Sequence, residues 1–439
     1  MKFTRIGAGC LVSLAALGLS LPAAGADAAQ APASPLPQPA PAASAPAKEA
    51  EGLKLGVSVT LRQDFTEVQD KADLLLDGNG IDGYRGRIRF SVQKNEPEDV
   101  AGGGIRLSTG ENPNPTSPFV RVGDGFRPWN FTIDQYYFQL RPFHRRAAAT
   151  LTVGKMPQPF WRGDQGYFRS EMIWDDDVSP VGVTLTNVFE KKDDGSLKVD
   201  NVIGFFPLNE ITDQRFVGLT EDPFLVADQL LIRYKKLGLA ASYYSFERLN
   251  GGLLAPNFLP DQGTAFVTTP ASAFLLRPGF QATNAQISVY PGANAFRKES
   301  FRVFDATAQV HGRLPWFESF GKPEVFVLGE WAHNFRVPDH RDGYGGTIGL
   351  RGGAYGAPGP NPWGAHFTWR SVDADTTLAT FADSDLGAGT DVKGFEVSAN
   401  YRITRNVQLT GFFFQWDGSP DKSTRVRRVF IDLTWDYSK

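Results

Sequence analysis

Apolar and polar side chains alternate along most of the chain after residue 52, with a period of two residues. Residues 53–62 read LKLGVSVTLR, and residues 84–93 read YRGRIRFSVQ. The same alternation returns in residues 224–235, 304–311, 395–403 and 429–437. Successive side chains of a strand point to opposite faces, so each such segment predicts a strand with one apolar and one polar face.

Including weaker segments, the alternation predicts about sixteen strands, an even number as in bacterial outer-membrane barrels. Their expected ranges are 53–65, 84–95, 99–110, 131–142, 149–155, 181–191, 196–207, 223–235, 237–248, 300–314, 323–335, 344–353, 364–372, 392–404, 406–417 and 424–437.

Most connections between these segments are alternately short and long, although the turns at 314–323 and 353–363 are longer than this rule prefers. Short turns fall at 95–99, 142–148, 191–196, 235–237 and 404–406, and long loops at 66–83, 111–130, 155–180, 208–222, 249–299 and 372–391. Short turns on one side and long loops on the other are typical of transmembrane barrels. We therefore expect an all-β fold, a transmembrane antiparallel β-barrel with both ends in the periplasm and the 249–299 loop outside the cell.

The first part of the chain has a different composition. Residues 1–26 carry an early Lys2 and Arg5, an apolar run and a small-residue ending, which predicts a secretory signal peptide. Residues 27–51 are rich in alanine and proline and predict an extended periplasmic linker. Residues 52–439 form the predicted outer-membrane barrel. The single cysteine, Cys10, falls in the signal, so we expect no disulfide or thiolate chemistry.

Composition and charge narrow the possible environments. The chain holds 34 Phe, 12 Tyr and 46 Gly. No later apolar run reaches the roughly 18 residues of a transmembrane helix. Removing Lys2 and Arg5 takes the formal net charge from −3 to about −5, too small a charge to indicate a nucleic-acid partner. The expected surroundings are outer-membrane lipid.

The 155–180 connection is the richest in possible function. Pro157 and Pro159 prevent the preceding strand from continuing, and aromatic residues alternate with both signs of charge after them. A loop of this length in a compact domain is usually functional or disordered, and its aromatic content argues against disorder. We expect it to fold inward across the barrel and to form a pore constriction. Its candidate residues are Arg162, Asp164, Arg169, Glu171, Asp175, Asp176 and Asp177.

Arg85, Arg87 and Arg89, hereafter the arginine row, share one face of a predicted strand. On a strand such residues lie about 7 Å apart, and in a water-filled lumen they would remain charged and attract anions. The alternative is a solvated inner wall whose charge is balanced by acidic residues of the loop. We include the arginine row in the candidate constriction.

The residues give little support for metal binding or catalysis. The run Asp175–Asp177 offers carboxylates to Ca²⁺, but its spacing is not that of a calcium loop, and pairing with wall arginines is the favoured interpretation. The five histidines lack metal-ligand spacing, and no GxSxG motif occurs. We expect no enzyme activity, no metal and no cofactor.

The organisation of this loop resembles that of a known family. The residues that carry the resemblance are Gly154-Lys155-Met156-Pro157, Pro159-Phe160-Trp161, Ile173-Trp174-Asp175-Asp176-Asp177, Pro180 and Gly182. They look like the putative porin family of Gram-negative outer membranes, and the strand-Gly-Lys entry is also similar to that of phosphate-selective porins. The resemblance implies a porin of sixteen to eighteen strands with no assigned solute. Porins of this kind are often homotrimers, although the sequence shows no interface.

The expected function is passive diffusion of small polar or ionic solutes, with a preference for anions. The main alternative is a secreted or surface all-β binding module, an adhesin or glycan-binding protein, which would need polar outer faces. An energised receptor would need a plug domain of well over about a hundred residues before the barrel. A barrel enzyme would need a Ser/His pair on facing strands.

Overall fold

The computed structural model describes residues 52–69, 81–95, 99–110, 119–122, 129–142, 149–163, 169–190, 197–208, 223–249, 301–314, 323–338, 341–352, 363–379, 381–383, 385–386, 389–418 and 424–438. The predicted signal peptide and linker, residues 1–51, therefore lie outside the described residues, as does most of the predicted 249–299 loop.

All the regular structure in this part of the chain is β-strand. The strands are β1 (Leu53–Gln69), β2 (Ile81–Lys94), β3 (Ala101–Thr109), β4 (Val120–Arg121), β5 (Phe131–Leu140), β6 (Ala149–Lys155), β7 (Val181–Glu190), β8 (Leu197–Pro207), β9 (Phe224–Tyr234), β10 (Leu237–Glu247), β11 (Phe301–Arg313), β12 (Glu324–Asn334), β13 (Asp342–Gly352), β14 (Trp363–Val372), β15 (Val392–Arg402), β16 (Val407–Gly418) and β17 (Thr424–Ser438).

The sixteen predicted strands are all present, and their ends lie within four residues of the predicted ends. The additional strand β4 has two residues and pairs with β2 through Arg85–Arg121 and Gly86–Val120. Two residues are too few to show an alternation, so the sequence pattern does not reveal β4.

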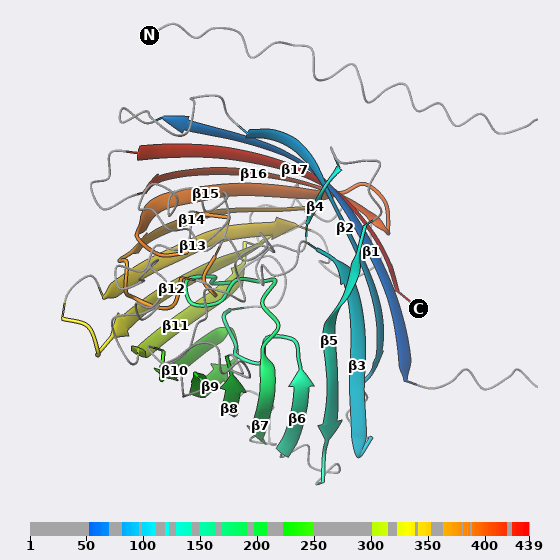
Figure 1. Ribbon diagram of the computed structural model, residues 1–439, viewed down its shortest axis with the longest axis vertical. Coiled ribbons are helices and arrows are strands. Elements are labelled where there is room, and N and C mark those ends of the chain that lie inside the picture. Colours follow the sequence, from blue (N-terminus) through cyan, green and yellow to red (C-terminus); the bar gives the residue numbers. More distant parts are fainter. Residues whose placement is uncertain are drawn as a thin grey trace, which may run out of the picture. The chain divides into compact units, whose positions relative to one another are not determined.

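The sixteen long strands close into an antiparallel barrel (Figure 1). Each pairs with its neighbours in the chain, and β1 pairs with β17 from Gly56–Ser438 to Gln69–Arg425. Closure leaves no strand edge unpaired, which a bilayer requires because it contains no water to satisfy backbone groups. The start of β1 and the end of β17 consequently lie at the same rim of the barrel.

The two faces of the barrel differ as the alternation predicts. Outward side chains are large and apolar, for example Phe90 and Ile431, which are 43% and 44% exposed. Ile88, on the same face of β2, is half-buried. The buried inward side chains include polar ones, such as Gln229 and Asp305, and apolar ones, such as Leu225 and Tyr244. Among the described residues, no helix is long and apolar enough to cross a membrane.

The backbone conformation at the end of β6 explains why residue 154, which precedes Lys155, is glycine. Its φ is +118°, a region that side chains with a Cβ rarely adopt. A Cβ there would also lie 2.3 Å from the carbonyl oxygen of Tyr136 in β5. The strand can therefore make this close approach and turn into the following connection only with glycine at this position.

Candidate functional site

The connection from β6 to β7, residues 156–180, closes on itself at its base. The backbone N–H of Met156 donates to the carbonyl of Pro180 over 2.9 Å. Further along, Ser170 donates to the carbonyl of Arg162 over 2.6 Å, and Gly163 and Arg169 form an isolated antiparallel bridge. We call residues 156–180 the first segment. These bonds fix the backbone from which the charged side chains of its described residues project.

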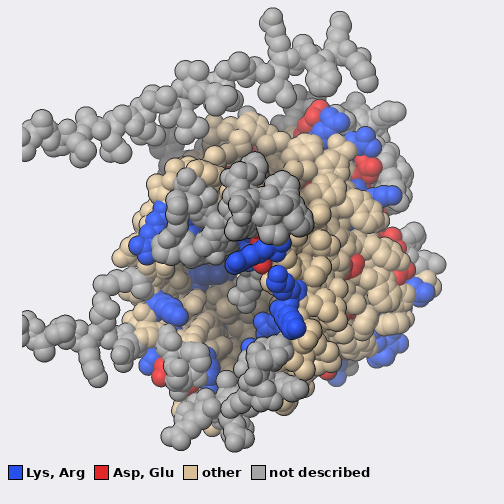
Figure 2. All heavy atoms as spheres, turned by 180° about the vertical axis from the view of Figure 1, so that it is seen from behind, with Lys and Arg blue, Asp and Glu red and all other residues tan. Residues whose placement is uncertain are grey.

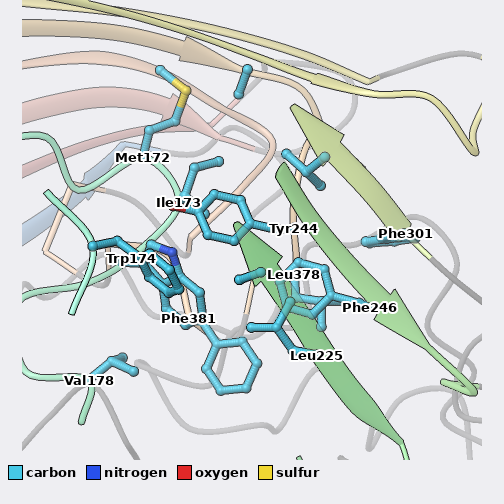
Figure 3. Packing of buried hydrophobic residues seen from close by; sticks show 14 of the residues in the cluster. Met172, Ile173, Trp174, Val178, Leu225, Tyr244, Phe246, Phe301, Leu378 and Phe381 are labelled. Carbon is cyan, nitrogen blue, oxygen red and sulfur yellow. The ribbon is translucent and has the colours of Figure 1, made fainter. Parts of the chain in front are cut away.

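Aromatic side chains hold the first segment against strands β8 to β10. The Phe160 ring lies 5.3 Å from that of Tyr244 in β10 and 6.0 Å from that of Phe206 in β8. The Trp174 ring lies 5.7 Å from Tyr244 and, like the Phe160 ring, is buried (Figure 3). Buried aromatic pairs contribute about 0.5–1.5 kcal/mol each beyond the area they bury, so this cluster is a substantial anchor.

Polar contacts with the barrel wall supplement this packing. The backbone N–H of Trp161 donates to Gln229 Oε1 in β9 over 2.6 Å, and Gln229 Nε2 donates back to the carbonyl of Trp161 over 2.9 Å. Ser170 Oγ donates to Glu330 in β12. The first segment is thus bonded to inward-facing residues of two strands, β9 and β12.

The arginine row has two different sets of partners. Arg87 Nη1 and Arg89 Nη2 both donate to the same oxygen of the first segment, Asp177 Oδ1, over 3.2 and 2.8 Å. Arg85 instead pairs with Asp64 in β1 over 2.9 Å. Because the same carboxylate also pairs with Arg428 of β17 over 3.0 Å, Arg85 belongs to a wall network rather than to the contact with the segment.

The two neighbouring aspartates of the run have other partners. Asp176 pairs with Arg162 over 2.9 Å and with Arg169, so these three charges are satisfied within the first segment. Asp175 Oδ1 accepts a hydrogen bond from the backbone N–H of Asp177 over 2.8 Å. The three consecutive carboxylates therefore have different partners. Asp175 accepts from a nearby backbone N–H, Asp176 pairs with arginines of the first segment, and Asp177 pairs with arginines of the barrel wall.

Their surroundings move the pKa values of these acids in opposite directions. Burial would raise the pKa of Asp177, but the guanidinium groups of Arg89 and Arg87 lower it to about 2. Burial and the charge of Asp177 raise the pKa of Asp175 well above its usual value. Burial and the charge of Asp176 do the same for Glu171. Asp177 therefore favours the ionised form, whereas burial disfavours ionisation of Asp175 and Glu171.

A second connection, residues 373–391 between β14 and β15, packs against the first segment. The backbone N–H of Asp175 donates to the carbonyl of Phe381 over 2.7 Å, and Asp383 N–H donates to the carbonyl of Glu171 over 3.1 Å. Asp383 also pairs with Arg370 of β14. The length of this loop was apparent from the sequence, but its Asp-, Ala- and Thr-rich composition did not indicate a contact with the first segment.

Three strand arginines at the site alternate with aromatic rings, an arrangement that the sequence did not reveal. Arg62 of β1 lies over the Phe430 ring at 4.0 Å and over the Phe119 ring at 4.2 Å. The Arg428 guanidinium also lies over the Phe430 ring, at 4.1 Å. The Arg87 guanidinium also lies over the Phe119 ring, at 4.6 Å. Residues far apart in the chain meet here because β1 pairs with both β2 and β17.

A cavity of about 760 Å³ lies between the first segment, the second connection and the wall. Among the described residues, its lining includes Arg62, Arg87, Arg89, Arg106, Arg162, Arg169, Glu171, Asp175, Asp176, Asp177 and Asp385. Figure 2, seen from behind the view of Figure 1, shows a hollow with Lys and Arg side chains at its margin.

The structure thus brings most of the sequence-predicted site residues to one cavity. Arg85 is not among the residues that line it, and Asp164 lies outside the described residues. Within the described part of the chain, no group of three or more His, Cys, Asp or Glu side chains is arranged to hold a metal ion.

Comparison with known families connects this barrel to a class of proteins. The family described as "Putative porin" matches residues 70–312 and 351–435. The chain belongs to this family. The porin is accordingly an outer-membrane β-barrel protein that acts as a channel, and its family is non-enzymatic. The family match favours a channel over the alternative of a surface binding module, and the apolar outer faces also disfavour that alternative.

Solved structures similar to this porin are other bacterial outer-membrane proteins. A loop-deletion mutant of OmpT from Vibrio cholerae is 11% identical and covers 88% of this chain and 100% of its own, with a TM-score of 0.44. A triple mutant of the Rhodopseudomonas blastica porin is 12% identical, with 87% and 100% coverage and a TM-score of 0.41. Salmonella typhi OmpF in complex with daunomycin is 10% identical, with 88% and 97% coverage and a TM-score of 0.47. A comparison with curated protein sequences finds no match.

Proposed function

We propose that this porin is a passive diffusion channel for small polar or ionic solutes, constricted by its first segment and selective for anions. The observation that carries the proposal is the cavity itself: arginines of β1, β2 and β3 line it together with the first segment. A solute that crosses the barrel there passes between charges held on both sides. Selectivity in such pores follows from width and from rings of charge.

The balance of charge supports a preference for anions. Among the described residues that line the cavity, eight are arginines and eight are Asp or Glu. Burial raises the pKa values of Glu171, Asp175 and Asp385, which favours their neutral forms. Arginine remains charged at all physiological pH values. These shifts weaken the negative charge of the lining relative to its arginines, and the field in the cavity therefore favours anions.

Reversal potentials in planar bilayers test this preference. With a tenfold KCl gradient across the membrane, the wild type should favour chloride over potassium. Replacing Arg87 and Arg89 together with glutamine should lower the chloride-to-potassium permeability ratio by about twofold or more, because two wall charges are lost. Neutralising Asp175, Asp176 and Asp177 together should raise the ratio. A cation-selective wild type, or a ratio that neither variant changes, would refute the proposal.

The position of the constriction has its own test. Deleting Gly163–Glu171 should widen the passage and raise the single-channel conductance, because this part of the first segment carries the bridge and the bond to Glu330. Folding of the variant is checked by its heat-modifiable mobility in gels. An unchanged conductance in a folded variant would show that the passage is limited elsewhere.

The oligomeric state is a separate part of the proposal. The resemblance to other porins implies a homotrimer. Chemical cross-linking in isolated outer membranes should therefore yield a species of three chains, and a single chain alone would contradict this assembly.

A further inference from the structure

We propose that Arg87 and Arg89 form a binding site for small carboxylates, which the porin's own Asp177 occupies as a tethered competitor. A carboxylate solute that enters the cavity takes the place of Asp177 on the two guanidinium groups. This inference rests on the proposed function, since it names the class of anion that the proposed pore recognises.

The geometry around Asp177 is that of a bound carboxylate. Its Oδ1 accepts hydrogen bonds from two guanidinium groups, Arg87 Nη1 at 3.2 Å and Arg89 Nη2 at 2.8 Å. Converging guanidinium donors recognise carboxylates through strong charge-assisted hydrogen bonds. Asp177 belongs to a connecting segment and not to the strand that carries the arginines, so the site is built by β2 and filled by another part of the chain.

The two arginines also have more donors than Asp177 uses. The Nε atoms of Arg87 and Arg89 are buried and have no hydrogen-bond partner among the described residues. Buried donors of this kind normally find partners. A free carboxylate has two oxygens and can rotate and translate to engage both arginines, whereas the backbone restricts the orientation of the Asp177 side chain.

Neighbouring groups hold the arginines in place without filling the site. The Phe119 ring covers one face of Arg87 at 4.6 Å, which leaves the donating edge of the guanidinium available. Asp134 of β5 lies 3.8 Å from Arg89 Nε and 2.5 Å from Arg106 Nε, so its hydrogen bond goes to Arg106. Both guanidinium groups also border the cavity through which solutes would arrive.

Displacement of Asp177 need not unfold the first segment. The remaining anchors are independent of Asp177: Asp176 bonds to Arg162, and the rings of Phe160 and Trp174 pack on Tyr244. A competitor attached to the same chain has a high effective concentration, in the millimolar range for short tethers. The apparent affinity for a free carboxylate is reduced by the fraction of sites left open, and removing the competitor restores it.

Asp176 provides a matched control for Asp177. Both are aspartates, they are adjacent, and replacing either with asparagine removes one negative charge from the same cavity lining. Of these two aspartates, Asp177 pairs with Arg87 and Arg89, whereas Asp176 pairs with Arg162 and Arg169 of its own segment. A difference between the two variants therefore reports the site and not the general field of the cavity.

The test measures binding of sodium trifluoroacetate to purified folded porin in detergent, by fluorine NMR. D177N should bind the probe about tenfold more tightly than the wild type, and D176N should match the wild type within about twofold. In the D177N background, R89K should remove the gain, because lysine keeps the charge but lacks the guanidinium fork. Heat-modifiable gel mobility verifies folding, and D177S serves as a second variant if D177N folds poorly.

Equal affinities in D177N and D176N would overturn the inference, since the charge alone would then explain any change. Tight binding that survives R89K would overturn it as well, because the paired arginines would not be the site. The measurement needs no ion flow. If the wild type showed no anion preference in bilayers, the proposed function would be refuted. The binding data would still decide whether the carboxylate site exists.

Discussion

Three consecutive aspartates show how the structure gives identical residues different properties. Asp177 faces Arg87 and Arg89, and these charges lower its pKa to about 2 against the effect of burial. Two residues earlier, burial and the negative charge of Asp177 raise the pKa of Asp175. The partner that each carboxylate meets, rather than its place in the acidic run, decides its charge.

The lowered pKa of Asp177 predicts when its contact with the wall is lost. A carboxyl group whose folded pKa is below its unfolded value of about 3.9 stabilises the fold fully above that value. The stabilisation is lost as the pH falls through the folded pKa of about 2. The difference between the unfolding temperatures of the wild type and D177N, measured by heat-modifiable gel mobility, should therefore be constant from about pH 8 to pH 5 and vanish only below about pH 2. A difference that vanishes already at pH 5 would contradict the pairing.

The pKa of Asp175 is shifted in the opposite direction, so its effect on stability has the opposite pH dependence. Because its folded pKa is raised, its contribution is most favourable below the unfolded value and is lost as the pH rises through the folded value. D175N keeps the oxygen that accepts from the Asp177 N–H but cannot ionise. We expect D175N to have a higher transition temperature than the wild type at pH 9 and the same one at pH 4. A variant that is less stable than the wild type at pH 9 would show that the carboxylate itself is required.

At the scale of the strand, the two-residue alternation places apolar side chains on the outer face of the barrel and polar side chains on the inner face. On β2, Phe90 is 43% exposed on the outer face and packs at 5.7 Å against the ring of Phe131 on β5. Its neighbour Ser91 belongs to the opposite face, as do Arg87 and Arg89. A shift of one residue in register would exchange these faces completely.

Arginine substitutions on adjacent positions of β2 test this assignment. Phe90→Arg should destabilise the barrel by about 2–4 kcal/mol if it lies near the middle of the bilayer, whereas Ser91→Arg should cost much less. The measurement is reversible unfolding in urea with lipid vesicles, or the folded yield in outer membranes. Equal effects of the two substitutions would show that the faces are assigned incorrectly.

At the scale of the whole molecule, the pairing of β1 with β17 determines which connections share a rim. Gly56 pairs with Ser438, so both ends of the barrel lie at one rim, together with the short turn at residues 403–406. The first segment and the 373–391 connection begin at the other rim because each follows an odd number of long strands, counted from the start of β1. The connection between β10 and β11 leaves from that rim as well.

The chain's cysteine content allows this topology to be tested. Its one cysteine, Cys10, lies in the predicted signal peptide, so an introduced cysteine is expected to be unique in the exported protein. A cysteine at Ala273, which lies outside the described residues, should react with an impermeant maleimide on intact cells. A cysteine at Arg405 should react only after the outer membrane is breached. The reverse pattern would show that the termini are outside.

The sequence predicted the barrel well because each strand carries its own evidence. Alternation is a local property, and the bilayer enforces it at every residue of every strand. The same reasoning identified the arginine row and the charged first segment. It did not predict the split of the row, in which Arg85 turns to Asp64 while Arg87 and Arg89 meet Asp177.

The sequence by itself thus determined the class of fold, the strands, the two faces and the segment that carries the charges. Only the tertiary structure decided which charges meet. Closure of β1 on β17 brings Arg62 to Phe430, and the packing of two connections from one rim brings Asp175 to Phe381. These partners are hundreds of residues apart in the chain, and ion pairing depends on distances of a few ångströms that no local pattern encodes.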